Sequence, residues 1–276
     1  MSQGGLTVKR HVWGLRLPVV TIALLLVFSA TVASQEAEGV HKHEMQGMET
    51  MQDKEEMAFS MGRMIYAMSC VHCHGAGGKG DGAAAIFIGP YSHPRPNDFT
   101  RGIFKFRSTE LGQLPMLTDL MRTIREGIPG IMPSFRNLGE TGIQQVALYI
   151  QRAFIQAELP TQTTIKYVEH VGPYTYPIES VKRGKVLYKT LGCFVCHGED
   201  GKGAKIPLHD KRGLSIRPID LTRQETFGNG TSHEDIYRTI MTGLDGTPMP
   251  GYSNLFKGKE DSAWDLVHYI LSLQGR

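Results

Sequence analysis

The 276-residue chain has few cysteines, few aromatic residues and almost no net charge beyond its first segment. Cysteine occurs four times, and aromatic residues make up 8% of the chain. The formal net charge is +3, but three basic and no acidic residues lie within the first 34 positions, which leaves 27 basic and 27 acidic residues in the remainder. A chain this evenly charged offers no general attraction for a nucleic acid. We therefore expect no nucleic-acid partner, and any charge used in docking must be local.

The sequence also lacks an apolar run that is clearly long enough to cross a membrane. Basic residues precede an apolar stretch from Pro18 to Phe28, which continues weakly to Ala33. A membrane-crossing helix needs about 20 apolar residues, slightly more than this stretch provides. The small residues Thr31 and Ala33 fit a cleavage site, so 1–33 is predicted to be a signal peptide, with an uncleaved membrane anchor as the alternative. Both interpretations place the remainder on the non-cytoplasmic side of a membrane, in the periplasm, either soluble or anchored.

The four cysteines form two short motifs, and none is left over. The first motif reads C-V-H-C-H and ends at His74; the second reads C-F-V-C-H and ends at His197. C-x-x-C-H is the attachment pattern of c-type haem. Its two thiols lie about one helical turn apart, so each can form a thioether to a haem vinyl group, and the histidine then lies beneath the ring, where it can bind iron. The predicted covalent haem attachments are Cys70, Cys73, Cys193 and Cys196.

Other uses of paired cysteines fit this sequence less well. A thioredoxin-like pair needs no following histidine and is expected in a βαβ setting, which the sequence does not offer. Zinc could be held by the two pairs together, but they lie about 120 residues apart instead of the usual 15–20. The chain is predicted to be exported and places every cysteine in a C-x-x-C-H motif. This pattern therefore predicts two covalently bound haems, each with its iron.

The two motifs belong to an internal repeat. Each follows a G-x-x-x-Y segment, which begins at Gly62 or Gly184, and each precedes a glycine-rich turn. The further matched segments are 95–101 with 217–223, 122–124 with 238–240, and 132–135 with 249–252. The offset between the halves is 123 residues at the first cysteine and 117 at the methionine of the last pair. Two tandem domains of common ancestry explain this pattern.

The repeat divides the chain into predicted regions. A flexible polar spacer (34–56) follows the signal peptide, and the first domain (57–158) is joined to the second (178–276) by a proline-containing linker (159–177). Helices are predicted over 57–73, 118–126, 142–157, 180–196, 232–242 and 261–273. Ser232 and Asp235 form the N-cap pattern of one of them. The long loops rich in glycine and proline between the helices are consistent with a large flat cofactor that fills each core.

The second axial ligand determines what a haem can do. Histidine with methionine raises the reduction potential and fills both axial positions, which suits electron transfer, whereas an open position permits substrate binding. Many methionines precede the first motif, namely Met45, Met48, Met51, Met57, Met61, Met64 and Met68. A ligand downstream of the motif is preferred, so these methionines are not the predicted iron ligands. Met132 and Met249 differ because they occupy equivalent repeat positions, each before a proline and after a loop that contains glycine.

These features resemble class I cytochrome c domains. The C-x-x-C-H start, the glycine-rich turn, the M-P-x-[FY] loop and the final apolar helix cover about 57–276, and two such domains in tandem resemble a dihaem c-type cytochrome. The resemblance implies an all-α fold in which a few helices and long loops surround each haem. It also implies that the axial iron ligands are His74 and Met132 in the first domain, and His197 and Met249 in the second.

Two arginines are further candidates for binding the haem. Arg95 and Arg217 could pair with haem propionates, because a guanidinium holds a carboxylate through two hydrogen bonds. A solvated arginine in a turn is the alternative for each. A loop carbonyl is expected to orient the proximal histidine, and in the first domain Pro90, Pro94 and Pro96 are the candidates for it.

The predicted function is electron transfer, as a shuttle or as the haem subunit of a respiratory or oxidoreductase complex. The predicted partners are redox proteins, a membrane respiratory complex among them, and the N-terminal segment could associate with the membrane. A dihaem enzyme of the peroxidase kind is the alternative. It needs an iron that lacks or can lose a protein ligand, whereas both halves here offer an equivalent methionine. A haem-based sensor is less consistent, because no output domain is attached.

Overall fold

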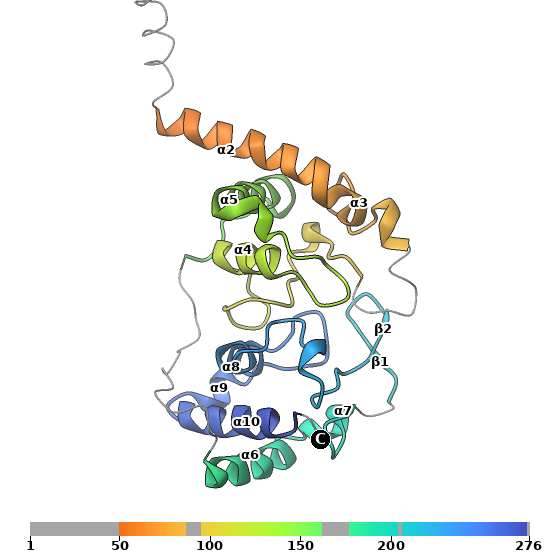
Figure 1. Ribbon diagram of the computed structural model, residues 1–276, viewed down its shortest axis with the longest axis vertical. Helices are drawn as coiled ribbons and strands as arrows, with labels where there is room; N and C mark the ends of the chain where they lie inside the picture. The colour runs from red at the N-terminus through yellow and green to blue at the C-terminus, as the bar shows by residue number, and fades with distance from the viewer. Residues whose placement is uncertain (1–49, 87–94, 162–176, 204–205, 275–276) are drawn as a thin grey trace, which may run out of the picture. The chain divides into compact units, whose positions relative to one another are not determined.

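The computed structural model describes residues 50–86, 95–161, 177–203 and 206–274. The chain divides into two compact units, Met1–Glu55 and Glu56–Arg276, and the second unit contains both haem motifs (Figure 1). The predicted signal peptide and most of the predicted spacer and linker lie outside the described residues. Among the residues that are described, no helix is both long and apolar enough to cross a membrane.

The first haem motif ends a long helical segment. Helix α2 (Met51–Ile65) runs directly into a π-helical turn, η1 (Tyr66–Cys70), and then into the short helix α3 (Val71–His74). Helix α2 begins earlier than predicted because Thr50 Oγ1 accepts a hydrogen bond from the Asp53 amide at 3.2 Å and caps its first turn. The last residues of the predicted spacer are therefore helical.

The remaining elements of the first domain surround one hydrophobic core. They are η2 (Ala83–Ile86), η3 (Phe99–Arg101), α4 (Leu117–Glu126), η4 (Arg136–Leu138), α5 (Gly139–Ile150) and the π-helical η5 (Gln151–Ile155). Apolar residues at helical spacing on α4 and α5 supply most of this core, and aromatic rings supply the remainder. Its most buried members include Tyr66, Ile143, Val146, Ala147 and Ile150.

The second domain repeats this plan and adds a small hairpin. Its elements are α6 (Ile178–Thr190), α7 (Cys193–His197), β1 (Leu208–His209), β2 (Ser215–Ile216), η6 (Gln224–Thr226), α8 (His233–Thr242), α9 (Ser253–Phe256) and α10 (Glu260–Ser272). The two strands pair antiparallel, with Leu208 opposite Ile216. Helix α10 is buried along most of its length and packs against α6. The expected helical fold of two cytochrome c-like domains is confirmed, and the hairpin is a minor exception.

The prediction of one continuous helix over 180–196 is wrong. Helix α6 ends at Thr190 and α7 starts at Cys193, with Gly192 between them in a left-handed conformation (φ 75°). The second domain has one more residue between the matched tyrosine and the first cysteine than the first domain has. That additional residue ends the helix at a glycine, whereas the first domain passes the same point through a π-helical turn.

A glycine makes the helix crossing possible in each domain. A Cβ atom at Gly62 would overlap the Gln145 carbonyl of α5, and one at Gly184 would overlap the Asp265 carbonyl of α10. The two backbones can approach this closely because glycine has no side chain. The crossings fix the helix that leads into each haem motif against the last long helix of its domain, and so position the motif.

Candidate functional site

Each C-x-x-C-H histidine is held by a carbonyl from a loop that follows it in the sequence. His74 Nδ1 lies 3.2 Å from the Asn97 carbonyl oxygen, and His197 Nδ1 lies 3.4 Å from the Ile219 carbonyl oxygen. A carbonyl only accepts, so Nδ1 carries the proton in both rings and Nε2 is the nitrogen that remains to bind a metal. The Asn97 carbonyl therefore orients His74, whereas the sequence predicts a proline carbonyl in this role. Pro96 is its neighbour, and Pro90 and Pro94 lie outside the described residues.

The repeated R-P-x-D-x-T segment shapes the turn that presents this carbonyl. Asp98 Oδ1 accepts hydrogen bonds from the Thr100 amide (3.1 Å) and hydroxyl (2.6 Å). Asp220 Oδ1 does the same with Thr222, at 2.9 and 2.6 Å. A short polar side chain that bonds to the backbone two residues on is a common way to hold a turn. The aspartates therefore support the residue immediately before them, whose carbonyl faces the histidine.

Aromatic side chains support both motif turns. The Tyr66 hydroxyl donates to the Gly75 carbonyl at 2.7 Å, and the Tyr188 hydroxyl donates to the Gly198 carbonyl at the same distance. In the first domain the Phe99 ring also stacks on His74, with ring centroids 4.6 Å apart. The matched tyrosines of the repeat thus tie each motif turn to the helix in front of it.

The chemistry of the four cysteines and two histidines fits a covalently attached haem. All four thiols are free, and each cysteine is partly buried. Burial raises the pKa of Cys70 to about 11 and also raises the pKa of Cys193, so these two thiols are neutral at physiological pH. Burial lowers the pKa of both motif histidines, which favours the neutral imidazole that binds a metal. Each motif thus provides two thiols for thioethers and one nitrogen for iron.

The two M-P loops are closed by similar, though not identical, backbone hydrogen bonds. In the first, the amides and carbonyls of Ile128 and Met132 bond to each other at 2.8 and 2.9 Å. In the second, the Leu244 amide donates to the Met249 carbonyl at 3.2 Å. Both methionines are partly exposed. The structure therefore places Met132 and Met249 at equivalent positions.

A glycine at the end of the preceding helix supports each loop. Gly127 and Gly243 both have positive φ, of 72° and 64°. A Cβ atom at Gly127 would meet the backbone of Met132 and Pro133, and one at Gly243 would meet the backbone of Pro250. These glycines let the M-P loop lie directly on the helix end. The sequence shows both as glycines of the loop before the methionine, and their role as supports depends on the fold.

The two predicted propionate ligands lie at equivalent points of the structure. Arg95 is partly buried and Arg217 is exposed. Neither forms an ion pair with any acidic residue among those that the structure describes.

Two arginines of the first domain bind the backbone of the second. Arg107 is fully buried, and it donates to the Phe104 carbonyl of its own loop and to the Thr242 carbonyl at the end of α8, each at 2.9 Å. Arg122 on α4 donates to the Asn229 carbonyl at 3.0 Å and to its side-chain oxygen at 2.7 Å. No pattern in the sequence predicts these contacts, because an interface between domains leaves no periodicity.

These contacts pair equivalent segments of the repeat. Arg107 and Asn229 are 122 residues apart, the same offset that separates Arg95 from Arg217. In each domain, the residue at this position contacts the α4 or α8 helix of the other domain. The interface is therefore formed twice, by corresponding loops and helices in a reciprocal arrangement.

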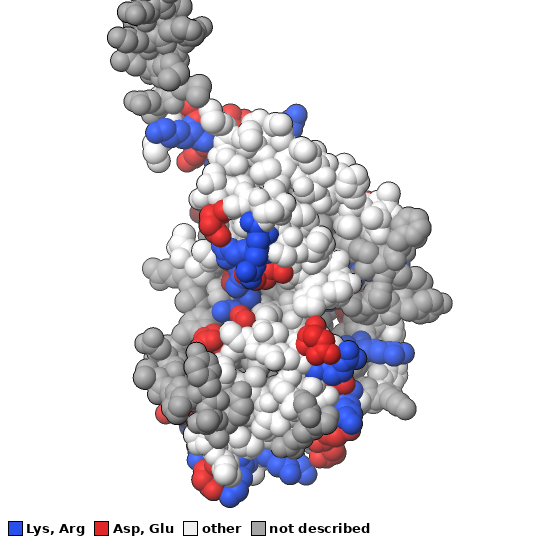
Figure 2. All heavy atoms as spheres, in the orientation of Figure 1, with Lys and Arg blue, Asp and Glu red and all other residues white. Residues whose placement is uncertain are grey.

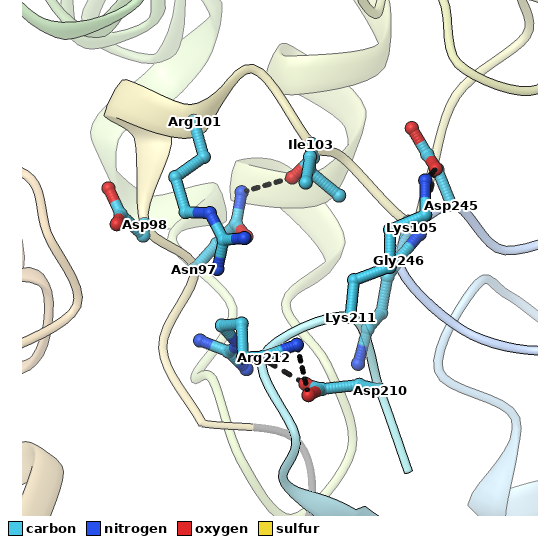
Figure 3. Close-up of a pocket in the computed structure, with 10 residues that line it drawn as sticks. All are labelled: Asn97, Asp98, Arg101, Ile103, Lys105, Asp210, Lys211, Arg212, Asp245 and Gly246. Carbon is cyan, nitrogen blue, oxygen red and sulfur yellow. Dashed lines mark hydrogen bonds and ion pairs between the residues drawn. The ribbon is translucent and has the colours of Figure 1, made fainter.

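A small cavity of about 30 Å³ lies where the two domains meet. Figure 3 shows its basic side chains converging, and they are Arg101, Lys105, Lys211 and Arg212. Lys211 pairs with Asp245 at 2.9 Å, and Arg212 pairs with Asp210 at 3.1 Å. Burial, and secondly the charge of Arg212, lower the pKa of Lys105. Asn97, whose carbonyl holds His74, also lines this cavity, so a charged cavity with four basic and three acidic side chains lies beside the first haem motif.

Comparisons with known proteins agree with this geometry. The family model "Cytochrome C oxidase, cbb3-type, subunit III" matches residues 57–150, and the model "Cytochrome c" matches residues 181–274. The chain is also similar to a chain of the Kuenenia stuttgartiensis reducing HAO-like protein complex, with 32% identity and a TM-score of 0.68. That match covers 78% of this chain and 96% of the other.

The fold, the two motifs and these matches define a protein with two cytochrome c domains in tandem. The chain belongs to the c-type cytochrome family. It is a dihaem cytochrome whose cofactors are two covalently bound c-type haems, and its cytochrome c domains indicate electron transfer.

Proposed function

We propose that this protein carries electrons between redox proteins on the non-cytoplasmic side of a membrane. The observation that carries the proposal is that each feature of the first site recurs in the second: the histidine–carbonyl bond, the tyrosine behind the motif and the supported M-P loop. Two equivalent sites in one compact unit suit a donor-to-acceptor path. One reactive haem beside one electron-transfer haem would instead favour two dissimilar sites.

The proposed axial ligands are His74 with Met132 and His197 with Met249. When bound, each haem gains or loses one electron. The protein's contribution is to keep the imidazole oriented through the Asn97 or Ile219 carbonyl and to hold the methionine-bearing loop against Gly127 or Gly243. A haem held by a histidine and a methionine from the protein would have a raised reduction potential, which suits electron transfer.

Replacement of each methionine in turn tests this assignment. Met132→Ala and Met249→Ala are each expected to abolish the methionine–iron absorption band of one haem. Each should lower the potential of that haem by on the order of 100 mV, because axial ligands tune haem potentials over about 0.8 V. Optical redox titration of the full-length holoprotein measures both effects. A high-spin haem in the wild type, or tight binding of cyanide or peroxide, would contradict the proposal and favour a dihaem enzyme.

Arg95 and Arg217 remain the proposed propionate contacts. Arg95→Gln should shift the potential of the first haem, because a guanidinium that binds the propionate places a positive charge near the iron and so disfavours its oxidised, more positive state. Lys105→Gln, in the charged cavity between the domains, is the matched comparison in the same half of the molecule. If the redox titration of Arg95→Gln matches that of the wild type while that of Lys105→Gln does not, the propionate role belongs to the cavity instead.

The proposed setting is the periplasm, with the protein either free or attached through residues 1–33. The similar solved chain belongs to a complex of two proteins, which supports a role as the haem subunit of an oxidoreductase complex. Co-purification with a redox protein from a native extract would support the subunit role. A monomer that exchanges electrons with several soluble partners would favour the shuttle.

A further inference from the structure

The outward face of α2 carries a stripe of methionines beside the first haem motif. Met57, Met61, Met64 and Met68 follow one another at intervals of four, three and four residues, which places them on one side of the helical segment. Their exposed fractions are 48%, 42%, 54% and 74%. We define these four residues as the methionine stripe. It lies opposite the helix face that packs at Gly62, and it ends two residues before Cys70.

The matched helix of the second domain is different at the same positions. At the repeat offset of 122 residues, the stripe corresponds to Glu179, Arg183, Val186 and Thr190 on α6. Glu179 pairs with Lys182 at 2.7 Å, and Arg183 pairs with Asp265 at 2.7 Å. On α6, two of the four matched positions carry ion-paired side chains and only the exposed Val186 is large and apolar, whereas all four positions in the first domain are exposed methionines. Because the two helices share their inward packing, the fold does not require the methionines.

The position of the stripe indicates what covers it. Its last member adjoins the attachment turn of the first haem, where His72 is exposed, so a protein seated on the stripe would also lie against that turn. Electrons pass efficiently only over short distances, so a redox partner has to make such a contact. Methionine is flexible and polarisable, and it is common on surfaces that adapt to a binding partner.

The charge of the helix is unfavourable for a lipid surface. Helix α2 contains two basic and three acidic residues, so it offers no attraction to anionic lipid. In the view of Figure 2, the surface toward the haem-motif end of α2 is mostly free of charged side chains. Apolar contact without a charged ring fits a stable subunit interface better than a brief, charge-steered encounter.

We infer that the methionine stripe is the docking surface for a haem-containing partner subunit, which exchanges electrons with the first haem of this protein. The inference rests on the proposed function and adds to it the docking domain and the chemistry of the contact. The similar solved chain, which is matched over 96% of its length, is itself part of a complex of two proteins. The partner surface is expected to be apolar at its centre.

Oxidation by chloramine-T, followed for each methionine by mass spectrometry, tests whether the stripe is covered. The full-length holoprotein is oxidised as a monomer, confirmed by sedimentation, and in the assembly isolated from its native extract. We expect the four methionines to react in the monomer and to react at least about tenfold more slowly in an assembly whose second component contains haem. Met241, which is 2% exposed, is the slow internal reference in both samples.

Several outcomes would overturn the inference. Equal reactivity in the monomer and the native assembly would overturn it, as would isolation of the protein only as a monomer with four reactive methionines. Protection within the monomer would assign the stripe to the chain's own N-terminal segment. Protection that depends on self-association would assign it to a second copy, and protection by phosphatidylethanolamine–phosphatidylglycerol vesicles alone would assign it to lipid.

A pair of variants separates docking from folding. Met61→Gln with Met64→Gln keeps side-chain length and helix propensity, and it should weaken the assembly by about tenfold or more, since apolar burial contributes on that scale. Val186→Gln, the matched change on α6, should leave the assembly intact. Both variants should keep the two wild-type haem potentials. A wild type that has a high-spin haem would contradict the proposed function without reference to the stripe, so the two failures are distinguishable.

Discussion

The two haem domains agree where they hold the cofactor and differ where they face their surroundings. Both cross two helices at a glycine, orient a histidine through a loop carbonyl, and support an M-P loop on a helix-terminal glycine. They differ in the residues that surround this framework. The first domain exposes the methionine stripe and passes into its motif through a π-helical turn, whereas the second has ion pairs on the matched helix and a break at Gly192. A duplicated fold can thus keep one cofactor site while its surfaces diverge.

The largest expected loss of stability comes from replacing the glycine at either helix crossing, and it tests whether the two crossings are equivalent. Gly184→Ala and Gly62→Ala each place a Cβ atom on a backbone carbonyl of the facing helix, so the helices must move apart. We expect each to lower the free energy of unfolding by about 3 kcal/mol, the upper range for overpacked sites. Thermal unfolding of the holoprotein measures the loss. Gly77→Ala, which would meet only the flexible Lys79 side chain, is the control.

If only one of the two glycine variants were strongly destabilised, the crossings would not be equivalent. A loss below about 0.5 kcal/mol in both, the size of an ordinary surface substitution, would mean that the helices separate easily.

The reciprocal contacts between the domains provide a second comparison. Arg107→Ala removes a fully buried side chain and leaves the Thr242 and Phe104 carbonyls without this donor, at an expected cost of about 2–3 kcal/mol. Arg122→Ala should cost about 1 kcal/mol, because its side chain is 21% exposed and water can replace part of its bonding. Calorimetry of both variants measures the loss and shows whether the two domains unfold in one transition or in two. Equal losses would contradict the ranking.

The smallest expected effect concerns pH and the Asp-x-Thr turns. The Thr222 side chain lowers the pKa of Asp220 by donating to its carboxylate. A carboxyl with a lowered pKa in the folded state contributes stability above its unfolded pKa, and that contribution is lost as the pH falls through the folded pKa. Solvent screens this partly exposed group, so Asp220→Asn should cost only a few tenths of a kcal/mol at neutral pH. Urea unfolding from pH 7 to pH 3 should show the variant and wild type converging.

A difference that stayed constant with pH would show that the turn depends on shape and not on the charge of Asp220. The same substitution at Asp98 shows whether the matched turn of the first domain has the same dependence.

Motifs and repeats predicted much of this molecule because they are local in the sequence. The two C-x-x-C-H turns, the equivalent M-P loops and the capping box of Ser232 and Asp235 could each be read from neighbouring residues. The helices also began and ended close to their predicted bounds where one apolar face was buried, as in α4 and α8. Local chemistry determines these features, so a single sequence contains the information.

Features that depend on distant residues could not be predicted in the same way. The choice of the Asn97 carbonyl over a proline depends on how the loop folds back under His74, and a motif does not encode that path. The buried position of Arg107 depends on a domain 135 residues away in sequence. One additional residue before Cys193 was visible as a shift in the repeat offset, and that signal could have indicated the break at Gly192.

The bonds from Arg107 and Arg122 to backbone atoms bear on how the molecule would respond to cleavage. These bonds hold the two halves together independently of the segment that connects them. Their acceptors at Thr242 and Asn229 include peptide carbonyls, which are present whatever side chain the residue carries. A proteolytic cut between residues 162 and 176 should therefore yield two fragments that still sediment as one particle. The halves would behave as a heterodimer that happens to be synthesised as one polypeptide.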